Sequence, residues 1–351
     1  MGGSIMGVGC FGKFSWLAVC SLPLSSVLLI NAPEINAQSL PKKITSGVST
    51  LGGPSAVLYL TQKVGLFERH GLDLQIVYFG SGAIAASGVV SGEVKITVMS
   101  GASTLAAALG GADLVQIGGL TNKLAYGLMV SPSIKSLQDL KGHSIGIAGF
   151  GGASDFAANY ILRKEGMIPG KDVILLAVGG QPERFSALAS GKLKAVLLEP
   201  PYTGRMENMG FRRLVDFPSL DLEFQNLGFV TTRSYLKADR ASCLNFLRAL
   251  TEGIHFFKSN KKESMTLLVS ILKTQDQDAL EETYTLNTHI IPDIPYSTLK
   301  GLQNTLELLA LRNPKAKNKD PREVIDDSLV KEMEDSGFIA YLRKTYPVVA
   351  Q

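Results

Sequence analysis

The stretch Gly52–Ala56 reads GGPSA and Gly151–Asp155 reads GGASD, each after a short apolar run and before a helical pattern. Other glycines and polar residues around the two stretches recur 99 positions apart. The pairs are Gly47 and Gly146, Gly52 and Gly151, Gly53 and Gly152, Ser55 and Ser154, Gly71 and Gly170, Asp73 and Asp172, Gly80 and Gly179, and Ser91-Gly92 and Ser190-Gly191. Since glycine positions record backbone constraints, this spacing predicts an internal repeat.

Each copy reads as three short strands separated by helices. The strands expected in the first copy are ITSGVS, LDLQIVYF and KITVMS, and those in the second are SIGIAG, DVILLAV and KAVLLE. Strands that alternate with helices indicate parallel βαβ units with right-handed crossovers. We therefore predict an α/β protein of two lobes, each a mostly parallel sheet flanked by helices, with a ligand cleft between the lobes.

Two further strands, at 125–130 and 228–232, are expected where the chain crosses between the lobes. This makes lobe 2 continuous, at 126–228, and lobe 1 discontinuous, at 38–125 plus 229–351. The segment after Lys237 has helical periodicity, and we expect its helices to cover lobe 1. Two extended crossings would act as a hinge, because few backbone torsions need to change for such lobes to close.

Composition favours a globular protein outside the nucleic-acid-binding class. Of 351 residues, 45% are apolar and 19% charged, and the net charge is +4. Basic runs with interleaved aromatic residues are missing from the sequence, which argues against nucleic acid as a partner. The three cysteines are Cys10, Cys20 and Cys243. Cys10 and Cys20 lie in the N-terminal segment 1–37, which is predicted to be a signal peptide that is cleaved off, so Cys243 would be the one cysteine left and is predicted to be a packed core thiol.

The N-terminal segment is predicted to be a secretory signal peptide, residues 1–37. Lys13 precedes an apolar stretch interrupted by serines and by Pro23, which is typical of a signal peptide and weakens the case for a spanning helix. The alternatives are a retained membrane anchor and an incorrectly assigned start. We expect an exported protein located in the periplasm or otherwise outside the cytoplasm.

Motifs for catalysis or cofactor binding are missing from the sequence. It has no Cys or His pair with zinc spacing, no phosphate-binding loop of the Walker type, and no nucleophile with a paired base. The four histidines, His70, His143, His255 and His289, are scattered and are expected to be surface or core residues. We therefore predict no catalytic residues, no metal and no cofactor.

Candidate ligand-binding residues follow from the position of the repeated turns. In open α/β sheets the loops at the carboxyl ends of the strands gather along one edge, where ligands bind. Backbone N–H groups and serines at helix starts favour an anionic or strongly polar group. The candidates are Thr50, Gly53, Ser55, Ser81, Gly82 and Ser100 in lobe 1, Asn122 near the first crossing, and Gly152, Ser154, Asp155, Gln181 and Glu199 in lobe 2. The alternative is that these turns are architectural only.

Charged residues at this edge refine the expected ligand. Glu199 occupies the place of Ser100 in the repeat, where a carboxylate would repel nitrate and suit an organic solute with an amine or hydroxyl donor. Asp155 has a second interpretation, as a stabiliser of its helix N-terminus. Arg184 could pair with an acid group or face solvent. Tyr126, Phe150 and Tyr202 could stack on a ring, with core packing as the alternative.

The order of several segments resembles a known family. These include GLFERHGLDLQIVYFGSGAIAASGVVSGEV, IKSLQDLKGHSIGIAGFGGASDFAANYIL, PERFSALASGKLKAVLLEPP and GFVTTRSYL. Together they resemble the solute-binding proteins of ABC importers for nitrate, sulfonates, taurine and thiamine-pyrimidine precursors, from about residue 43 to 341. The resemblance implies a type II periplasmic-binding-protein fold, a small-molecule ligand and an ABC permease as membrane partner, and we expect a monomer.

The same resemblance leaves two alternatives open. One branch of the family makes the thiamine pyrimidine from pyridoxal phosphate with a cysteine cluster and an active-site histidine, and this chain lacks the cluster. The other alternative is a ligand sensor without transport. The expected function is an exported receptor for a small polar organic ligand, of the sulfonate, carboxylate or pyrimidine type.

Overall fold

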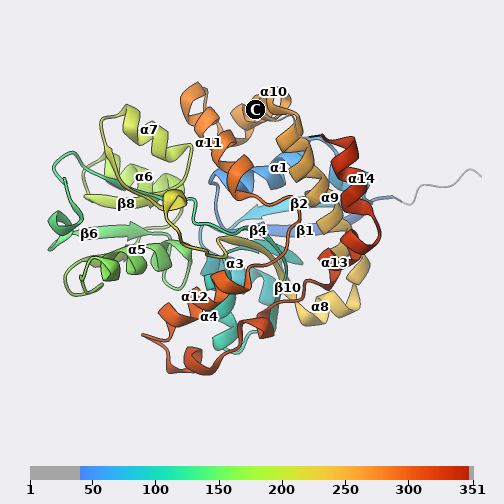
Figure 1. Ribbon diagram of the computed structural model, residues 1–351, viewed down its shortest axis with the longest axis horizontal. Coiled ribbons are helices and arrows are strands. Elements are labelled where there is room, and N and C mark those ends of the chain that lie inside the picture. The colour runs from blue at the N-terminus through green and yellow to red at the C-terminus, as the bar shows by residue number, and fades with distance from the viewer. Residues whose placement is uncertain (1–39, 348–351) are drawn as a thin grey trace, which may run out of the picture. The chain divides into compact units, whose positions relative to one another are not determined.

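A computed structural model describes residues 40–347. The expected signal peptide, residues 1–37, lies outside the described residues. Two five-stranded sheets organise the described chain, and Figure 1 shows the helices that flank each of them. None of the helices within 40–347 is long and apolar enough to cross a membrane.

The first sheet has the strand order β2-β1-β3-β10-β4. Strand β1 pairs in parallel with β2 and β3, and β10 runs antiparallel between β3 and β4. The strands are β1 (Lys42–Val48), β2 (Leu72–Tyr78), β3 (Ile96–Met99), β4 (Leu114–Thr121) and β10 (Leu227–Thr232).

The second sheet repeats this arrangement in the order β7-β6-β8-β5-β9. Strand β6 pairs in parallel with β7 and β8, and β5 runs antiparallel between β8 and β9. The strands are β5 (Gly127–Val130), β6 (Ser144–Ile147), β7 (Ile174–Ala177), β8 (Ala195–Leu198) and β9 (Arg212–Asp216). The predicted α/β class with two mostly parallel sheets is confirmed.

In each sheet the antiparallel strand is the first strand after the chain crosses over. Strand β5 follows the first crossing and β10 the second. Because β10 begins at Leu227, its first two residues precede the lobe boundary expected at 228/229. The boundaries at 125/126 and 228/229 stay our proposal.

The internal repeat is visible in the matching elements. Helix α3 (Gly82–Val90) and helix α6 (Gln181–Ala189) begin and end 99 positions apart, as do β3 and β8. Gly80 and Gly179, in the turns before these helices, both have positive φ, at 72° and 107°. Glycine adopts such a backbone conformation without strain, which explains why both copies of the repeat have glycine at this position.

The Gly-Gly turns at Gly52 and Gly151 differ in detail. Gly151 has a φ of 76°, whereas Gly52 has an ordinary φ of −78°. A side chain at Gly52 would bring its Cβ to 1.6 Å from Oε2 of Glu199, so glycine is required there for close approach. After Gly52 the chain forms a 3-10 turn, Gly53–Ser55, whereas after Gly152 it enters α5 (Ala153–Lys164) directly.

Helices from both ends of the described chain cover the first sheet. Residues of α1, α2, α9, α10, α11, α13 and α14 share one core with alternate residues of β1, β3, β4 and β10, and α3 and α4 pack on the other face. The helices are α1 (Ala56–Lys63), α2 (Leu66–Arg69), α4 (Gly101–Leu109), α8 (Arg233–Ala238), α9 (Arg240–Ser259), α10 (Lys261–Leu272), α11 (Gln277–Ile290), α12 (Leu299–Leu309), α13 (Ser328–Asp335) and α14 (Phe338–Thr345).

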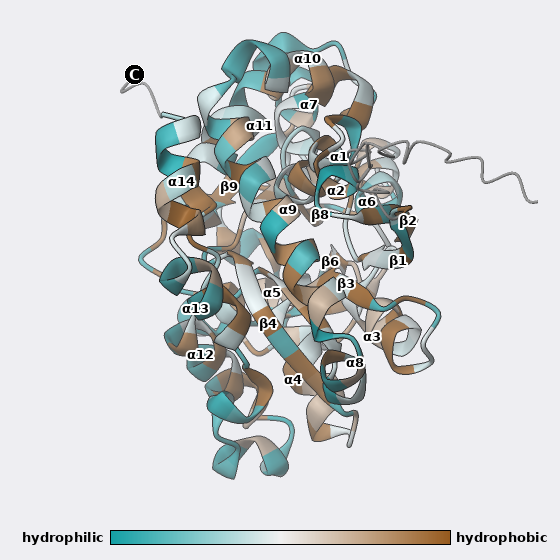
Figure 2. Cartoon of the chain, turned by 90° about the vertical axis from the view of Figure 1, so that its right-hand side faces the viewer, coloured by the Kyte–Doolittle hydropathy of each residue, from teal (hydrophilic) through white to brown (hydrophobic). Residues whose placement is uncertain are grey.

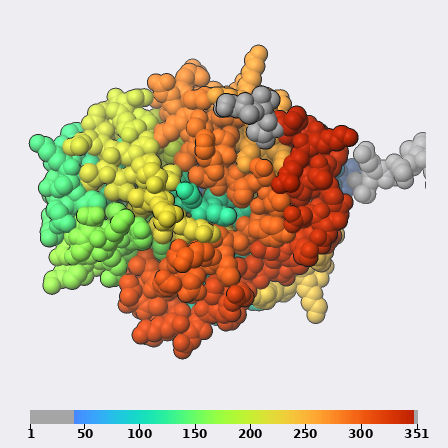
Figure 3. Space-filling view, in the orientation of Figure 1, coloured from blue at the N-terminus to red at the C-terminus, as the bar shows by residue number. Residues whose placement is uncertain are grey.

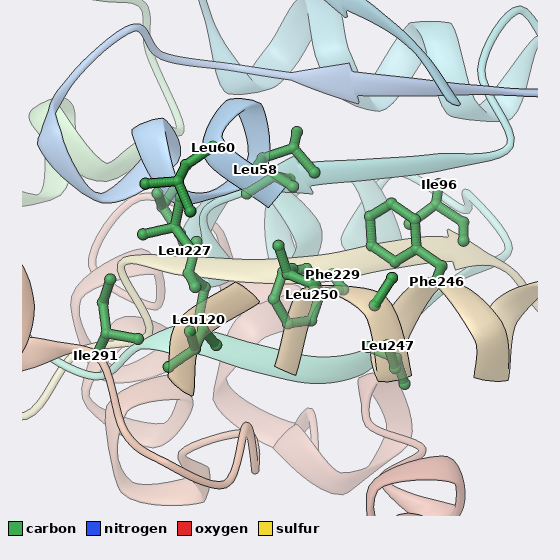
Figure 4. Packing of buried hydrophobic residues seen from close by; sticks show 14 of the residues in the cluster. Leu58, Leu60, Ile96, Leu120, Leu227, Phe229, Phe246, Leu247, Leu250 and Ile291 are labelled. Atoms are coloured by element: carbon green, nitrogen blue, oxygen red, sulfur yellow. The ribbon is translucent and has the colours of Figure 1, made fainter. Parts of the chain in front are cut away.

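The centre of this core lies between β10 and α9. Figure 4 shows Phe229 of β10 among Phe246, Leu247 and Leu250 of α9, with Leu58 and Leu60 of α1 in the upper part of the view. The ring of Phe246 lies 5.4 Å from that of Phe67 and 6.0 Å from that of Phe229, measured between centroids. In Figure 2, hydrophilic residues lie on the outer turns of α10, α11 and α12.

Cys243 belongs to this core and is buried, as expected. Burial raises the pKa of its thiol to about 12, which keeps the sulfur protonated and unreactive at neutral pH.

The second sheet has its own core. Helix α5 packs with β6 and β8 on one face, and α6 and α7 (Tyr202–Asn208) pack on the other. Strands β6 and β7 are followed by α5 and α6, and residues of the loops before these helices, Gly149 and Gly180 among them, line a cavity together with loops of the first sheet. The second lobe, green to yellow in Figure 3, lies directly against the orange helices of the first.

Candidate functional site

A cavity of about 30 Å³ lies where loops of the two sheets meet. This volume has room for about two water-sized groups. The first sheet's part of the lining is Ser49, Thr50, Gly80, Ser81, Gly82, Ala83, Ser100, Ser103, Asn226 and Leu227, and the second's is Tyr126, Ala148, Gly149, Phe150, Gly152, Ala153, Ser154, Gly180 and Arg184. The cavity is therefore a small space lined by both lobes, in which serines, Thr50, Asn226 and Arg184 supply the polar side chains.

Four helices begin at this cavity. Ser81 accepts a hydrogen bond from the amide of Ile84 and caps α3, and Ser100 accepts one from the amide of Ser103 and caps α4. Gly152 and Gly180 occupy the N-cap positions of α5 and α6 and have no side chain to accept such a bond. Each helix N-terminus carries a partial positive charge, so the four together favour an anion in the cavity.

Arg184 adds a full positive charge to the cavity wall. Its side chain is 1% exposed, and its guanidinium lies 5.8 Å from the centroid of the Tyr126 ring. It donates hydrogen bonds to the carbonyl oxygens of Gly179, Gly180 and Leu197. Within residues 40–347 it has no carboxylate partner at salt-bridge distance. A buried cation without an ion pair is costly, so this charge favours an anionic ligand.

Glu199 lies behind the cavity wall. Its carboxylate is 1% exposed, and Oε2 accepts hydrogen bonds from Nε2 of Gln181 at 3.0 Å and from Oγ1 of Thr50 at 3.3 Å. Its Oε1 has no hydrogen-bond partner among the described residues. Burial raises the pKa of Glu199 from 4.5 to about 7, although the charge of Arg184 opposes the shift. Glu199 therefore does not line the cavity, and nothing in its position requires a ligand with a donor.

We predict that Glu199→Gln will change how stability depends on pH. The folded protein holds a proton on Glu199 up to about pH 7, whereas the unfolded chain releases it near 4.5. Native Glu199 therefore contributes stability below pH 4.5, and this contribution is lost as the pH rises to 7. Urea unfolding at pH 5 and pH 7.5 measures this. Between the two pH values the free energy of unfolding of the wild type should fall, relative to that of Glu199→Gln, by roughly 3 kcal/mol at most. Parallel curves for the two proteins would contradict the assignment.

The structure brings together about half of the predicted site residues. Those that line the cavity are Thr50, Ser81, Gly82, Ser100, Gly152 and Ser154. Gln181 and Glu199 form the layer behind the wall. The other predicted residues, Gly53, Ser55, Asn122 and Asp155, lie outside the cavity lining. A ligand role stays a prediction for the whole set.

The four outlying residues make contacts of another kind. The amide of Gly53 donates to the carbonyl of Pro200, and Ser55 donates to the carbonyls of its own turn. Asn122 accepts a main-chain hydrogen bond from Phe224, which ties the two crossings together. Asp155 accepts from the amide of Gly151, which agrees with its second interpretation as a stabiliser of the helix start.

Asp155 also links the two lobes. Its Oδ1 lies 3.4 Å from Nη1 of Arg312, a residue that follows α12 of the first lobe, and Arg312 also donates to Asn159. A second link joins Arg213 and Glu282, whose Nη2 and Oε1 are 2.5 Å apart. Both pairs join side chains of the two lobes in the described structure.

Removing the first link should favour lobe opening. Because Arg312 is 42% exposed, we expect Arg312→Ala to weaken ligand binding only about two- to fivefold, as for a partly exposed ion pair. Small-angle scattering of the ligand-free variant should give a larger radius of gyration than wild type. Arg322→Ala, which removes an exposed pair within one segment, is the matched control. Unchanged affinity and radius would show that the link does not hold the lobes.

Comparison with known proteins places the chain in a family. Residues 54–264 match the family model described as NMT1/THI5 like. The chain belongs to this family. A relative in Bacillus subtilis (strain 168), named "Putative aliphatic sulfonates-binding protein", is 26% identical over 275 residues, which cover 76% of this chain and 80% of the relative.

Solved structures share the fold of this NMT1/THI5-like protein. The alkanesulfonate-binding protein SsuA of Xanthomonas axonopodis pv. citri bound to MOPS matches with a TM-score of 0.67 at 19% identity, covering 84% of this chain and 98% of SsuA. The periplasmic nitrate-binding protein NrtA of Synechocystis PCC 6803 matches with a TM-score of 0.69 at 13% identity, covering 85% and 89%. The expected type II periplasmic-binding-protein fold is confirmed.

Proposed function

We propose that this chain is the exported solute receptor of an ABC importer and binds a small organic anion, such as a sulfonate or carboxylate, between its two lobes. The observation that carries the proposal is the buried guanidinium of Arg184, which forms no salt bridge within residues 40–347, in a cavity where four helices begin. The names of the relatives, which refer to binding of sulfonates or nitrate, support a receptor over the pyridoxal-phosphate-consuming alternative.

The energetics fit a ligand held by hydrogen bonds and closure. A micromolar complex needs about 8 kcal/mol. Four helix N-termini supply roughly 1–4 kcal/mol, and a hydrogen bond to a charged group about 1.5–3 kcal/mol. The serines of the lining and the burial of the ligand upon closure supply the rest. The receptor is proposed to act as a periplasmic or otherwise extracytoplasmic monomer that delivers its ligand to a membrane permease.

Thermal unfolding of the purified protein with a panel of solutes tests this proposal. The panel is methanesulfonate, taurine, nitrate, acetate, benzoate and a substituted pyrimidine. An organic anion at 100 times its Kd should stabilise the protein by about 2.7 kcal/mol. Stabilisation by the uncharged pyrimidine alone, or consumption of added pyridoxal phosphate, would contradict the proposal.

A further inference from the structure

The side chain of Asn226 lines the cavity from the second crossing between the lobes. Asn226 directly precedes β10 and is 1% exposed. Its main-chain N–H donates to the carbonyl oxygen of Thr121, which fixes the backbone beside β4. Within residues 40–347, neither Nδ2 nor Oδ1 of its amide has a hydrogen-bond partner. A buried amide without partners is costly, so this side chain is suited to binding a ligand.

The preceding residue, Gln225, shows what a structural amide does in this segment. Its Nε2 donates to the carbonyl oxygens of Thr121 and Leu227. Its Oε1 accepts from the amide of Thr298. Gln225 therefore holds the crossing with its whole side chain, whereas the amide of Asn226 forms no such bond within the described chain. The packing of the crossing does not explain why residue 226 is an amide.

The carboxyl of Glu199 is the alternative partner for the Asn226 amide. Burial raises the pKa of Glu199, and Asn226 is one of the hydrogen-bonding groups that oppose the shift. A donor lowers the pKa of a carboxyl, so Nδ2 is the end of the amide that faces Glu199. Oδ1 is the other end, and it is left for the cavity.

Oδ1 of Asn226 differs from the other polar atoms of the cavity because it can only accept hydrogen bonds. The other side-chain oxygens of the lining belong to the hydroxyl groups of serines, Thr50 and Tyr126, which are able to donate. Arg184 and the four helix N-termini are donors as well. An acid group that is ionised has no proton to give to Oδ1. This oxygen therefore requires a second group on the ligand, a hydroxyl or an amine.

The charge of the cavity distinguishes a hydroxyl from an ammonium group. Arg184 and the four helix N-termini are positive, and none of the described residues that line the cavity carries a carboxylate. Burial raises the pKa of Glu199, behind the wall, to about 7, so this carboxyl does not offset the positive charge at lower pH. An ammonium group would be repelled here, whereas a neutral hydroxyl donates without that cost.

On the basis of the proposed function, we propose that the ligand is a short anion with a hydroxyl group one or two carbons from its acid group, and that Asn226 recognises this hydroxyl. The acid group lies toward Arg184 and the helix N-termini, and the hydroxyl donates to Oδ1 of Asn226. The volume of the cavity, about 30 Å³, restricts such a ligand to a short chain. Asn226 is then a specificity-determining residue that the set predicted from the sequence lacks.

Calorimetric titration at pH 6 with 2-hydroxyethanesulfonate and ethanesulfonate tests this proposal. The two anions differ by one hydroxyl group, and lactate and propionate are the equivalent carboxylates. In the pair whose acid group the protein binds, the hydroxyl compound should bind at least about tenfold more tightly, because without it Oδ1 stays buried and unpaired. Taurine, which has an amine in place of the hydroxyl, should bind no more tightly than ethanesulfonate.

The same titrations separate failure of this proposal from failure of the proposed function. Equal affinities within each pair would overturn the hydroxyl site and leave the organic-anion receptor standing. Taurine as the tightest ligand would do the same, since the donor would then be an ammonium group. Failure of every sulfonate and carboxylate to bind would overturn both.

Asn226→Leu tests the residue, because leucine is similar in size and has no polar atom. We expect the preference for the hydroxyl to fall to about twofold or less, with an ethanesulfonate affinity within about fivefold of wild type. Asn304→Leu is the matched control, because Asn304 donates to the carbonyl of Glu223 in the same crossing and lies outside the cavity lining. This control should keep the tenfold preference.

Two results with these variants would overturn the role of Asn226. One is a folded Asn226→Leu protein that keeps the preference of the wild type. The other is loss of the preference in both variants, which would assign the effect to the crossing as a whole. Asn226→Ser, whose shorter side chain is polar, serves if leucine unfolds the protein, and the same loss of preference is expected of it.

Discussion

Arg184→Met is expected to weaken sulfonate binding by about 30-fold or more, a larger functional effect than we expect for Arg312→Ala. Met keeps much of the length and apolar volume of the side chain and removes the charge. Arg184 is the buried cation of the cavity lining, and its forked guanidinium matches the geometry of a sulfonate or carboxylate. Loss of one charge-assisted contact to a buried anion costs about 2–5 kcal/mol, which corresponds to this change in Kd.

Calorimetric titration of methanesulfonate measures the change directly. Arg184→Lys retains a point charge without the fork and should give an intermediate affinity. Arg205→Met is the matched control, because Arg205 belongs to the same lobe and packs over Phe185 and Tyr202 outside the cavity. Since Arg184 also binds three carbonyl oxygens, circular dichroism must show that Arg184→Met is folded. Wild-type affinity in a folded Arg184→Met protein would refute the anion site.

The fold could be predicted from the sequence because the internal repeat includes glycines at positions where the backbone conformation favours glycine. Gly80 and Gly179 have positive φ in equivalent turns, so another residue at either position would strain the backbone. The spacing of 99 residues between the two copies is therefore still visible in these glycines. The helices that follow, α3 and α6, match residue for residue in length. The difference between the turns at Gly52 and Gly151 was not predictable, because it depends on the contact between Gly52 and Glu199, which are far apart in the chain.

The site was predictable only where it depends on local structure. Ser81 and Ser100 are N-caps, and a serine before a helical pattern is a local feature of the sequence. Asp155 is paired with Arg312, 157 positions away, and no local pattern indicates this contact. The direction of the Glu199 side chain is likewise set by packing against the other lobe.

The sequence alone leaves two environments open for Arg184, an acid group of the ligand or solvent, and the predicted site does not include this residue. A signal for it existed, because Gln181, Arg184 and Leu188 follow helical spacing and are the buried residues of α6. An arginine on the same face as a buried leucine and a buried glutamine points inward. The helical periodicity of residues 181–189 therefore indicates that Arg184 faces the interior of the protein and not solvent.

Phe246→Ala is expected to lower the free energy of unfolding by about 3–5 kcal/mol, the largest effect on stability. The side chain is fully buried, and its ring packs between Phe67 of α2 and Phe229 of β10. In the chain, Phe67 precedes the strands of the second sheet, and Phe229 and Phe246 follow them. The cavity left by Phe246→Ala would therefore disturb contacts between the two separate segments that build the first sheet and its helices. We expect the melting temperature to fall by about 6 °C or more.

Urea and thermal unfolding of Phe246→Ala measure this loss, with Phe150→Ala as the matched control. Phe150 is 57% exposed, and its truncation should change stability by less than about 1 kcal/mol. If α9 were peripheral and not part of the core of the first lobe, Phe246→Ala would lower the free energy of unfolding no more than Phe150→Ala does. A large loss confined to Phe246→Ala would instead mean that the C-terminal helices are required for the first sheet to fold. The receptor would then close two lobes of which only the second is built from a continuous chain.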